Sequence, residues 1–146
     1  MAYELMFQTK CPSWLYEVEK GATTIWESWG AIAQDGTVST YSYNHYAFGC
    51  VGEWMYREMG GLQAEEPGYK KIRIAPAWDC GLSWARVVEE TPYGTAYVVW
   101  EKDDNRKYLN VQIPPNTTAE IVLSERRTET VGSGIKGGKN RFSQNI

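Results

Sequence analysis

The pattern of the sequence changes near residue 65, and this change limits the possible folds more than any other feature. Residues 1–66 carry three basic and nine acidic side chains, whereas residues 67–146 carry twelve basic and nine acidic ones. Apolar residues recur at helical spacing in the first part, while the second part shows short alternating runs separated by turn residues. The sequence therefore predicts an α+β chain, with helices in residues 1–66 and an antiparallel β-sandwich in residues 67–146.

Two helices are expected in the first part. The clearer one covers residues 45–59, where apolar side chains recur on one face and a pair of glycines follows. Ser42 and Asn44 are candidate N-caps of this helix, because their side chains accept hydrogen bonds from free backbone N–H groups. A shorter helix is expected in residues 12–21, since proline is favoured in a first turn and glycine often follows a helix.

Five strands are expected in the second part, because short runs rich in β-branched residues alternate with proline, glycine and asparagine turns. They cover residues 70–75, 82–89, 95–101, 107–113 and 118–123. The connection between the two parts is expected in residues 60–68, where glycine and proline gather. The tail after about residue 132 has too little apolar content to be expected as an ordered element.

Charge and hydropathy exclude two classes of partner. The net charge is −3, and basic residues cluster no more densely than in pairs such as Lys70-Lys71. Nucleic acid is therefore a poor partner, since binding to phosphates needs concentrated positive charge. The longest apolar run, Ala96 to Trp100, has five residues, whereas a bilayer-spanning helix needs about 20. We expect neither a nucleic-acid-binding nor a membrane protein.

The three cysteines, Cys11, Cys50 and Cys80, are widely spaced and odd in number. Such usage is typical of reduced thiols, and together with the lack of a signal-peptide pattern it favours a cytoplasmic location, with a leader further upstream left open. No pair of cysteines has metal-ligand spacing, and His45 is the one histidine of the sequence. We therefore expect no metal site.

One segment combines the residue types of a sugar-binding site. Residues 21–29 are rich in β-branched and aromatic residues and are expected to be extended. Alternation along an extended backbone would place Glu27 and Trp29 on one side and Trp26 on the other. In sugar sites an indole ring covers the apolar face of the sugar, while a carboxylate binds a hydroxyl group or activates water. His45 and its neighbouring tyrosines add hydrogen-bond donors at the expected helix start.

The same residues also fit a purely structural interpretation. A glutamate such as Glu27 is commonly a solvated surface residue, and tryptophans are commonly core residues. His45 is equally compatible with a structural role at a helix start. The acidic pair Glu17 and Glu19 is interpreted as a solvated face and is given no chemical role. Residue types alone leave both interpretations open.

A recognisable pattern runs through three stretches of the first part. They are Pro12-Ser13-Trp14-Leu15-Tyr16, Gly21-Ala22-Thr23-Thr24-Ile25-Trp26-Glu27 and Ser42-Tyr43-Asn44-His45-Tyr46-Ala47-Phe48-Gly49. These stretches resemble the last part of the catalytic domain of bacterial α-L-rhamnosidases, and residues 68–72, 91–94 and 113–117 continue the resemblance. In that family an (α/α)6 barrel, also called a six-hairpin glycosidase domain, precedes a C-terminal β-sandwich. The resemblance implies that residues 1–66 form the end of such a barrel and residues 67–146 the sandwich.

The resemblance also implies a role for each candidate residue. In this family hydrolysis inverts the anomeric centre, and the glutamate of the Thr-Thr-Ile-Trp-Glu motif, here Glu27, is the general base that deprotonates the attacking water. His45, Trp29 and Trp26 would line the rhamnose pocket. Terminal α-L-rhamnose would be released from rhamnose-containing glycosides without a metal or another cofactor.

The family's general acid lies on an earlier part of the barrel, to which no residue of this sequence corresponds. The resemblance therefore implies a C-terminal fragment that is inactive alone, since acid and base assistance each contribute about 10²–10⁴ to the rate. Its helices are expected to need the missing barrel or self-association to cover their apolar faces. Two alternatives stay open. One is a non-catalytic carbohydrate-binding module in which Trp26, Trp29 and His45 hold a sugar, and the other is a structural remnant.

Overall fold

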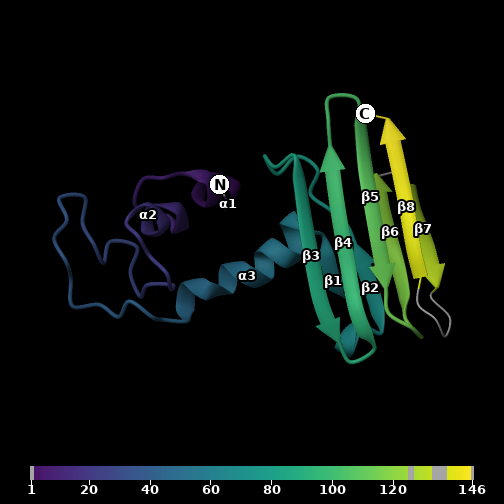
Figure 1. Ribbon diagram of the computed structural model, residues 1–146, viewed down its shortest axis with the longest axis horizontal. Helices are drawn as coiled ribbons and strands as arrows, with labels where there is room; N and C mark the ends of the chain where they lie inside the picture. Colours follow the sequence, from purple (N-terminus) through teal and green to yellow (C-terminus); the bar gives the residue numbers. More distant parts are fainter. Residues whose placement is uncertain (1, 125–126, 133–137, 146) are drawn as a thin grey trace. The chain divides into compact units, whose positions relative to one another are not determined.

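The computed structural model describes residues 2–124, 127–132 and 138–145, and the chain divides into two compact units (Figure 1). One unit ends at Gly52 and the other begins at Glu53. The first contains short helices and long irregular segments, and the second contains two four-stranded sheets. The predicted α+β class is therefore confirmed. Among the described residues, no helix has the length and apolar character needed to span a bilayer.

The first unit begins with helices α1 (Ala2–Phe7) and α2 (Trp14–Glu19). Ser13 is the N-cap of α2, because its backbone is extended and its side chain accepts a hydrogen bond from the Tyr16 N–H at 3.0 Å. The shorter of the two predicted helices is therefore confirmed. Pro12, however, precedes the cap instead of occupying the first turn.

A helical segment follows from Ala47 to Met59. It consists of the 3₁₀ turn η1 (Ala47–Cys50), helix α3 (Val51–Trp54) and the π-helical turn η2 (Met55–Met59). The helix predicted at residues 45–59 is thus confirmed apart from its first two residues. The predicted caps are wrong, because the N-cap is Tyr46, while the Ser42 hydroxyl and the Asn44 backbone bond to one another.

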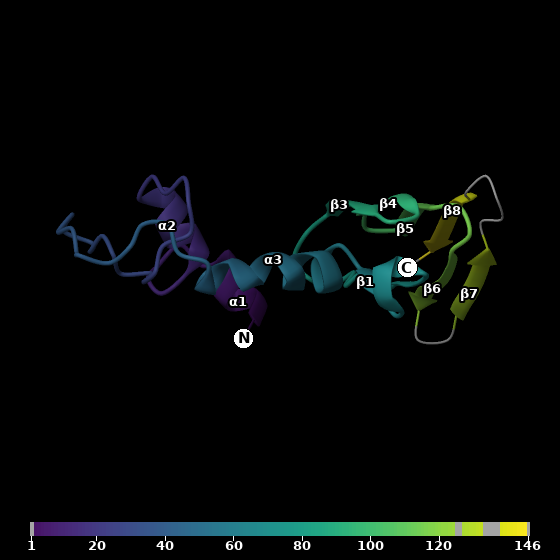
Figure 2. The same cartoon turned by 90° about the horizontal axis from the view of Figure 1, so that it is seen from below.

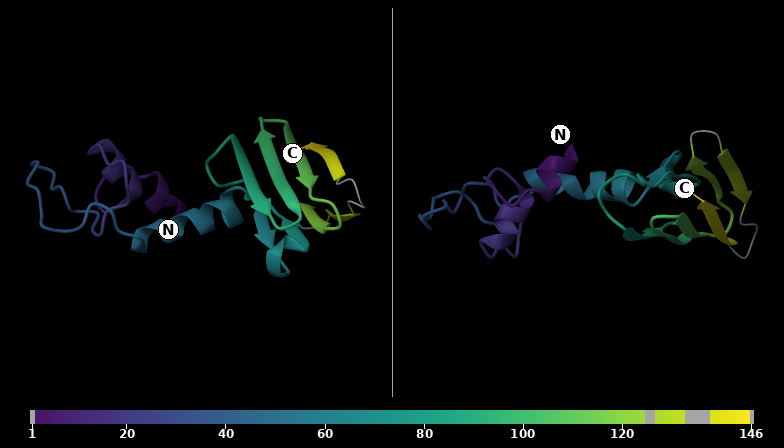
Figure 3. Two further views of the ribbon diagram at one scale, coloured as in Figure 1. Left: turned by 60° about the horizontal axis from the view of Figure 1, so that its bottom comes forward. Right: turned by 90° about the horizontal axis from the view of Figure 1, so that it is seen from above.

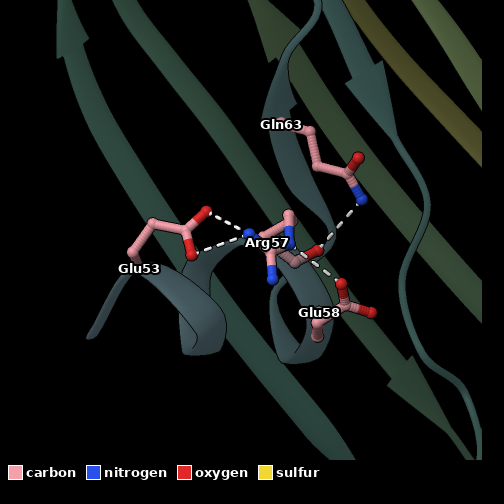
Figure 4. A network of polar contacts seen from close by, with 4 residues as sticks. All are labelled: Glu53, Arg57, Glu58 and Gln63. Atoms are coloured by element: carbon pink, nitrogen blue, oxygen red, sulfur yellow. Dashed lines mark hydrogen bonds and ion pairs between the residues drawn. The ribbon is translucent and has the colours of Figure 1, made fainter. Parts of the chain in front are cut away.

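Side chains on the last turns of this segment form a polar network (Figure 4). The Arg57 guanidinium donates to both carboxylate oxygens of Glu53, at 2.6 and 2.8 Å, and to Glu58 at 2.9 Å. The hydrogen bond to Glu58 and the nearby charge of Glu53 raise the pKa of Arg57. The Gln63 amide donates to the Arg57 carbonyl at 3.3 Å. Exposed i,i+4 ion pairs contribute about 0.3–0.5 kcal/mol each, so the network orients the end of the helix more than it stabilises it.

Two four-stranded sheets form the second unit. One has the order β1 (Leu62–Ala64), β2 (Lys71–Ile74), β6 (Thr118–Ser124) and β7 (Arg127–Gly132), and the other has the order β3 (Trp84–Thr91), β4 (Gly94–Lys102), β5 (Arg106–Ile113) and β8 (Gly138–Asn145). The 3₁₀ turn η3 (Pro67–Tyr69) lies between β1 and β2 in the chain. Neighbouring strands are antiparallel except β2 and β6, which are parallel. Figure 2 shows β3, β4 and β5 in one layer and β1 and β6 in another.

The five predicted strands are confirmed as β2, β3, β4, β5 and β6, each within two residues at either end. The sequence did not predict β1, β7 or β8. The expectation of an unordered tail is wrong for residues 138–145, which form β8 and pair with β5 along eight positions (Figures 1 and 3). An edge strand obtains its hydrogen bonds from its neighbour, so it needs little apolar content of its own. Residues 133–137 and 146, which the same expectation covered, lie outside the described residues.

The core of the second unit is made of side chains that alternate along the strands. The buried set comprises Ile72, Ile74, Ala119, Ile121 and Leu123 from one sheet and Val98, Trp100, Leu109, Val111 and Ile113 from the other. Trp100 is fully buried, its indole N–H donates to the Met59 carbonyl at 2.8 Å, and its ring meets the edge of Trp78 at 5.4 Å. The end of the helical segment is therefore bonded to the core of the sandwich.

Two glycines let the chain approach this core closely. A Cβ atom at Gly60 would lie 1.9 Å from the Val87 Cγ2 atom. Gly61 has a φ of +79°, and a Cβ atom there would lie 2.4 Å from the Pro76 nitrogen. The left-handed glycine that the sequence predicted after the helix is thus Gly61.

Candidate active site

Two segments of the first unit are joined by hydrogen bonds. One contains Glu27, the predicted base, and the other contains His45. The Glu27 N–H donates to the Ser42 carbonyl at 2.9 Å, and the His45 N–H donates to the Ile25 carbonyl at 2.8 Å. The Thr24 hydroxyl donates to the Tyr43 carbonyl between them. These bonds resemble a short sheet ladder, although neither segment forms a regular strand.

The nine-residue extended segment predicted at residues 21–29 is only partly present. The backbone turns or bends on both sides of Ile25 and Trp26, and a turn joins Ser28 to Ala31. The predicted alternation holds where the ladder bonds are made, because Trp26 is buried while Glu27 is exposed. Beyond Glu27 the ladder stops, and the chain turns.

Glu27 is held by its neighbour in a defined orientation. Its Oε2 atom accepts a hydrogen bond from the Ser42 N–H at 2.8 Å. Because the Glu27 N–H also donates to Ser42, the two residues are joined in both directions. The Oε1 atom has no hydrogen-bond partner among the described residues, and the side chain is exposed. One oxygen of the carboxylate is thus fixed and the other is available to a ligand.

His45 is half-buried at the start of the helical segment. Its Nδ1 atom accepts a hydrogen bond from the Ala47 N–H at 3.2 Å, so in this arrangement the ring carries its proton on Nε2. The ring stacks on Tyr46 with the two centroids 5.0 Å apart. The Nε2–H group is the remaining donor of the ring.

The two predicted tryptophans have different surroundings. Trp26 is 3% exposed, and its ring meets the edge of Tyr43 at 5.3 Å. A ring this buried acts in the described unit as a packing residue, and its contact with a sugar stays a prediction. Trp29 is half-buried, stacks on Phe48 at 4.3 Å and meets the edge of Trp14 at 5.5 Å. Its indole nitrogen is buried and has no partner among the described residues.

Glu17 is a residue that the sequence interpretation missed. It is 2% exposed, so the solvated face predicted for Glu17 is wrong, while Glu19 is exposed. Its Oε2 atom accepts a hydrogen bond from the Trp26 N–H at 3.3 Å, and its Oε1 atom is buried without a partner among the described residues. Burial raises the pKa of Glu17, and the hydrogen bond from Trp26 opposes that effect. Glu17 therefore supports the backbone immediately before Glu27.

The pattern of α2 explains why Glu17 was missed. Apolar Val18 is 61% exposed, whereas polar Ser13 and Glu17 are buried together with Tyr16. The Tyr16 hydroxyl donates to the Ile32 carbonyl at 2.7 Å, so this face of α2 contacts the loop that follows Glu27. The spacing of residues 13, 16 and 17, which places them on one helical face, is the signal that could have identified Glu17.

A hollow of about 280 Å³ is lined by residues of α2 and of the segment that precedes Trp26. Glu17, Thr23, Thr24 and Ile25 are among its lining residues, and Glu27, Trp29 and His45 are not. Within the described residues, no group of three or more histidine, cysteine, aspartate or glutamate side chains is placed to hold a metal ion. The three cysteines are free thiols.

Family comparisons match both parts of the chain. Residues 61–138 match the bacterial alpha-L-rhamnosidase C-terminal domain, and residues 1–59 match the bacterial alpha-L-rhamnosidase 6 hairpin glycosidase domain. An alpha-L-rhamnosidase of Formosa agariphila is 38% identical over 96% of this chain and 16% of its own length.

The solved structures that are similar to this chain are also alpha-L-rhamnosidases. The crystal structure of Streptomyces avermitilis alpha-L-rhamnosidase complexed with L-rhamnose superposes with a TM-score of 0.89 at 34% identity, over 98% of this chain and 16% of that one. The native α-L-rhamnosidase of Aspergillus terreus superposes with a TM-score of 0.84 at 36% identity, over 95% of this chain and 17% of that one. The chain thus spans about a sixth of the length of these relatives. From both parts of its sequence and from its fold, we conclude that this chain belongs to the bacterial α-L-rhamnosidase family.

Proposed function

We propose that this chain supplies the general base and part of the sugar pocket of an inverting α-L-rhamnosidase, with Glu27 as the base. The observation that supports this most directly is the two-way link between Glu27 and Ser42, which fixes one carboxylate oxygen and leaves the other open. A general base needs this combination, because its lone pair must be aimed at a water molecule while the side chain stays still.

In this proposal the sugar is hydrolysed with inversion. Water lies on the face of the sugar opposite the leaving group, and Oε1 of Glu27 takes its proton as the C–O bond to the aglycone breaks. The Nε2–H of His45 donates to a sugar hydroxyl, and Trp29, together with Trp26, offers apolar surface to the C–H face of rhamnose. No step requires a metal or another cofactor.

The general acid must stand about 6.5–9.5 Å from Glu27, on the leaving-group side of the sugar. We propose that it comes from a part of the barrel that has no counterpart among these 146 residues. The chain alone would then turn over no rhamnoside, and the complete enzyme would act on rhamnose-containing glycosides.

A chimera tests the proposal. This chain replaces the matching segment of the Streptomyces avermitilis enzyme, and hydrolysis of 4-nitrophenyl α-L-rhamnoside is followed in the chimera and in its variants. Glu27→Gln should lower kcat by about 10²–10⁴ with little change in KM. Glu27→Ala should regain turnover in excess azide, which attacks without a base, and the product should be the β-azide.

Glu19→Gln is the matched control, because Glu19 is an exposed glutamate on α2. It should leave both kinetic constants unchanged. Full activity of the Glu27→Gln chimera, or an α-configured azide product from Glu27→Ala, would remove Glu27 from the role of general base. Turnover of the substrate by the unfused chain would contradict the proposal that the acid lies elsewhere.

A further inference from the structure

The outer face of the sheet β3-β4-β5-β8 contains a hollow of about 490 Å³ that the proposed catalytic role does not use. The four strands lie side by side in Figures 1 and 3, and residues from all four line the hollow. Its size falls within the range of about 300–1,000 Å³ found for small-molecule sites. All of its lining residues belong to the second unit.

The floor of this hollow is polar and comes from the two central strands. Tyr97 of β4 and Asn110 and Gln112 of β5 alternate with the buried residues Val98 and Val111, so they point away from the core. Amide and phenol groups donate and accept hydrogen bonds, which matches the two-way hydrogen bonding of sugar hydroxyls. The floor therefore suits a ligand with many hydroxyl groups.

The walls of the hollow come from the two edge strands, and each contributes an arginine. The register places Arg86 of β3 opposite Val99, Val99 opposite Asn110, and Asn110 opposite Arg141 of β8. The two arginines thus stand in one row across the sheet, with their Cα atoms about 14 Å apart at the usual strand spacing. A ligand that extends across the row can therefore meet both guanidinium groups.

Neither arginine has a carboxylate partner among the described residues, and both are exposed. Arg57, Arg73 and Arg127, by contrast, each pair with a glutamate. The Arg86 guanidinium lies over the Tyr97 ring, 5.5 Å from its centroid, which orients its donors without neutralising its charge.

Two carboxylates of this face, Glu90 and Glu101, do not line the hollow. Glu90, at the end of β3, accepts hydrogen bonds from the Thr95 hydroxyl at 2.9 and 3.0 Å. Glu101 lies opposite Trp84, one step along the face from Arg86, and does not line the hollow. Arg86 and Arg141 therefore flank a floor of uncharged groups that form hydrogen bonds.

We propose that this outer face binds an acidic oligosaccharide, whose carboxylate or sulfate groups meet Arg86 and Arg141 while its hydroxyls bond to Asn110 and Gln112. Guanidinium groups bind both kinds of anion in a bidentate manner. The residues of this site differ from those of the proposed catalytic site, and binding here does not depend on hydrolysis. It would hold an acidic glycan on the sandwich.

Isothermal titration of the whole chain tests this site with three trisaccharides of equal length. They are trigalacturonate, a sulfated galactose trisaccharide and the neutral galactose trisaccharide, each measured at 20 and 150 mM salt. At least one of the two anionic sugars should bind ten-fold or more tightly than the neutral one, and its affinity should fall with salt. The tighter of the two identifies the acidic group.

Arginine variants provide the control. Arg86→Gln and Arg141→Gln should each weaken binding of the anionic sugar at least five-fold. Arg127→Gln removes the same charge from an exposed position on β7, in the other sheet, and should change nothing. Equal affinity for the neutral sugar, a loss in Arg127→Gln as large as in Arg86→Gln, or no binding of either anionic sugar would overturn the proposal. Inorganic sulfate that displaces the sugar at equal concentration would do so too.

Discussion

The carboxylate of Glu27 accepts a hydrogen bond from the Ser42 N–H at 2.8 Å, and the Glu27 N–H donates to the Ser42 carbonyl at 2.9 Å. The glutamate is therefore oriented by main-chain atoms fifteen residues further along the chain. A backbone donor cannot be lost by changing a side chain, unless the new residue is proline.

Ser42→Pro in the chimera should lower kcat about ten-fold or more, because the carboxylate loses a charge-assisted hydrogen bond worth about 1.5–3 kcal/mol. KM should change little, since the sugar keeps its other contacts. Ser42→Ala keeps the N–H group and should retain most of the activity. Steady-state kinetics compare the two, and an equal loss in both variants would show that the Ser42 hydroxyl, not its N–H, supports Glu27.

Glu17 should make the stability of the first unit depend on pH. Its pKa is raised in the folded chain, so its contribution is fully present below the pKa of the unfolded chain and is lost as pH rises through the folded pKa. Glu17→Gln removes this loss of stability, because glutamine does not ionise. At pH 8 the variant should therefore be more stable than the parent, because it carries no buried negative charge.

Denaturant unfolding at pH 4, 6 and 8 measures this difference. The advantage of Glu17→Gln should shrink towards pH 4, where the parent carboxyl group is protonated. Glu19→Gln, on the same helix but exposed, should show no such pH dependence. A constant difference between Glu17→Gln and the parent at all three pH values would mean that the charge of Glu17 is not the cause.

Trp100 should be the most sensitive tryptophan of the second unit. Trp100→Phe removes the donor to the Met59 carbonyl and leaves a small cavity in the core, so it should cost about 2–4 kcal/mol. Trp84→Phe makes the same change at a side chain that is 63% exposed and should stay within about 0.5 kcal/mol of the parent. Thermal and denaturant unfolding would reveal the contrast, and similar losses in both variants would contradict it.

The two parts of the chain should differ in their resistance to proteolysis. We expect residues 69–125 to fold independently, and residues 1–66 to need a covering surface for exposed side chains such as Val18, Tyr41 and Tyr46. Limited trypsin digestion with mass spectrometry should leave the sandwich intact and cleave the helical part first. Light scattering should show association that increases with concentration. A resistant helical part with a digested sandwich would contradict this expectation.

The strands that the sequence predicted are those in which apolar and polar residues alternate clearly. In β4 and β5, buried and half-buried side chains alternate around Trp100 and Leu109, so the period of two is visible without a partner. β7 and β8 lack that signal, because these edge strands consist mainly of polar residues that are exposed or half-buried. Their positions follow from pairing with β6 and β5, which a linear pattern does not contain.

Some residues of the candidate site could also be predicted from local sequence, and others could not. Glu27 and His45 were selected from short motifs and a family resemblance; backbone hydrogen bonds join their segments, and their chemical roles stay predictions. The burial of Glu17 depends on which face of α2 meets the loop after Glu27, and its apolar residues pointed to a different face. Local motifs could therefore identify the proposed base more readily than the buried residue that supports its backbone.

The bond between Trp100 and Met59 also restricts where such genes can recombine. A crossover at residue 60, between the two matched domains, would join a helix end from one parent to a sandwich from another, so the carbonyl that accepts from the Trp100 indole would be positioned by a foreign helix end. It would also require the incoming glycines to fit beside Val87 and Pro76. A crossover ahead of Glu53 would transfer the last helical turns together with the sheets, so hybrid enzymes joined there should be the ones that tolerate exchange.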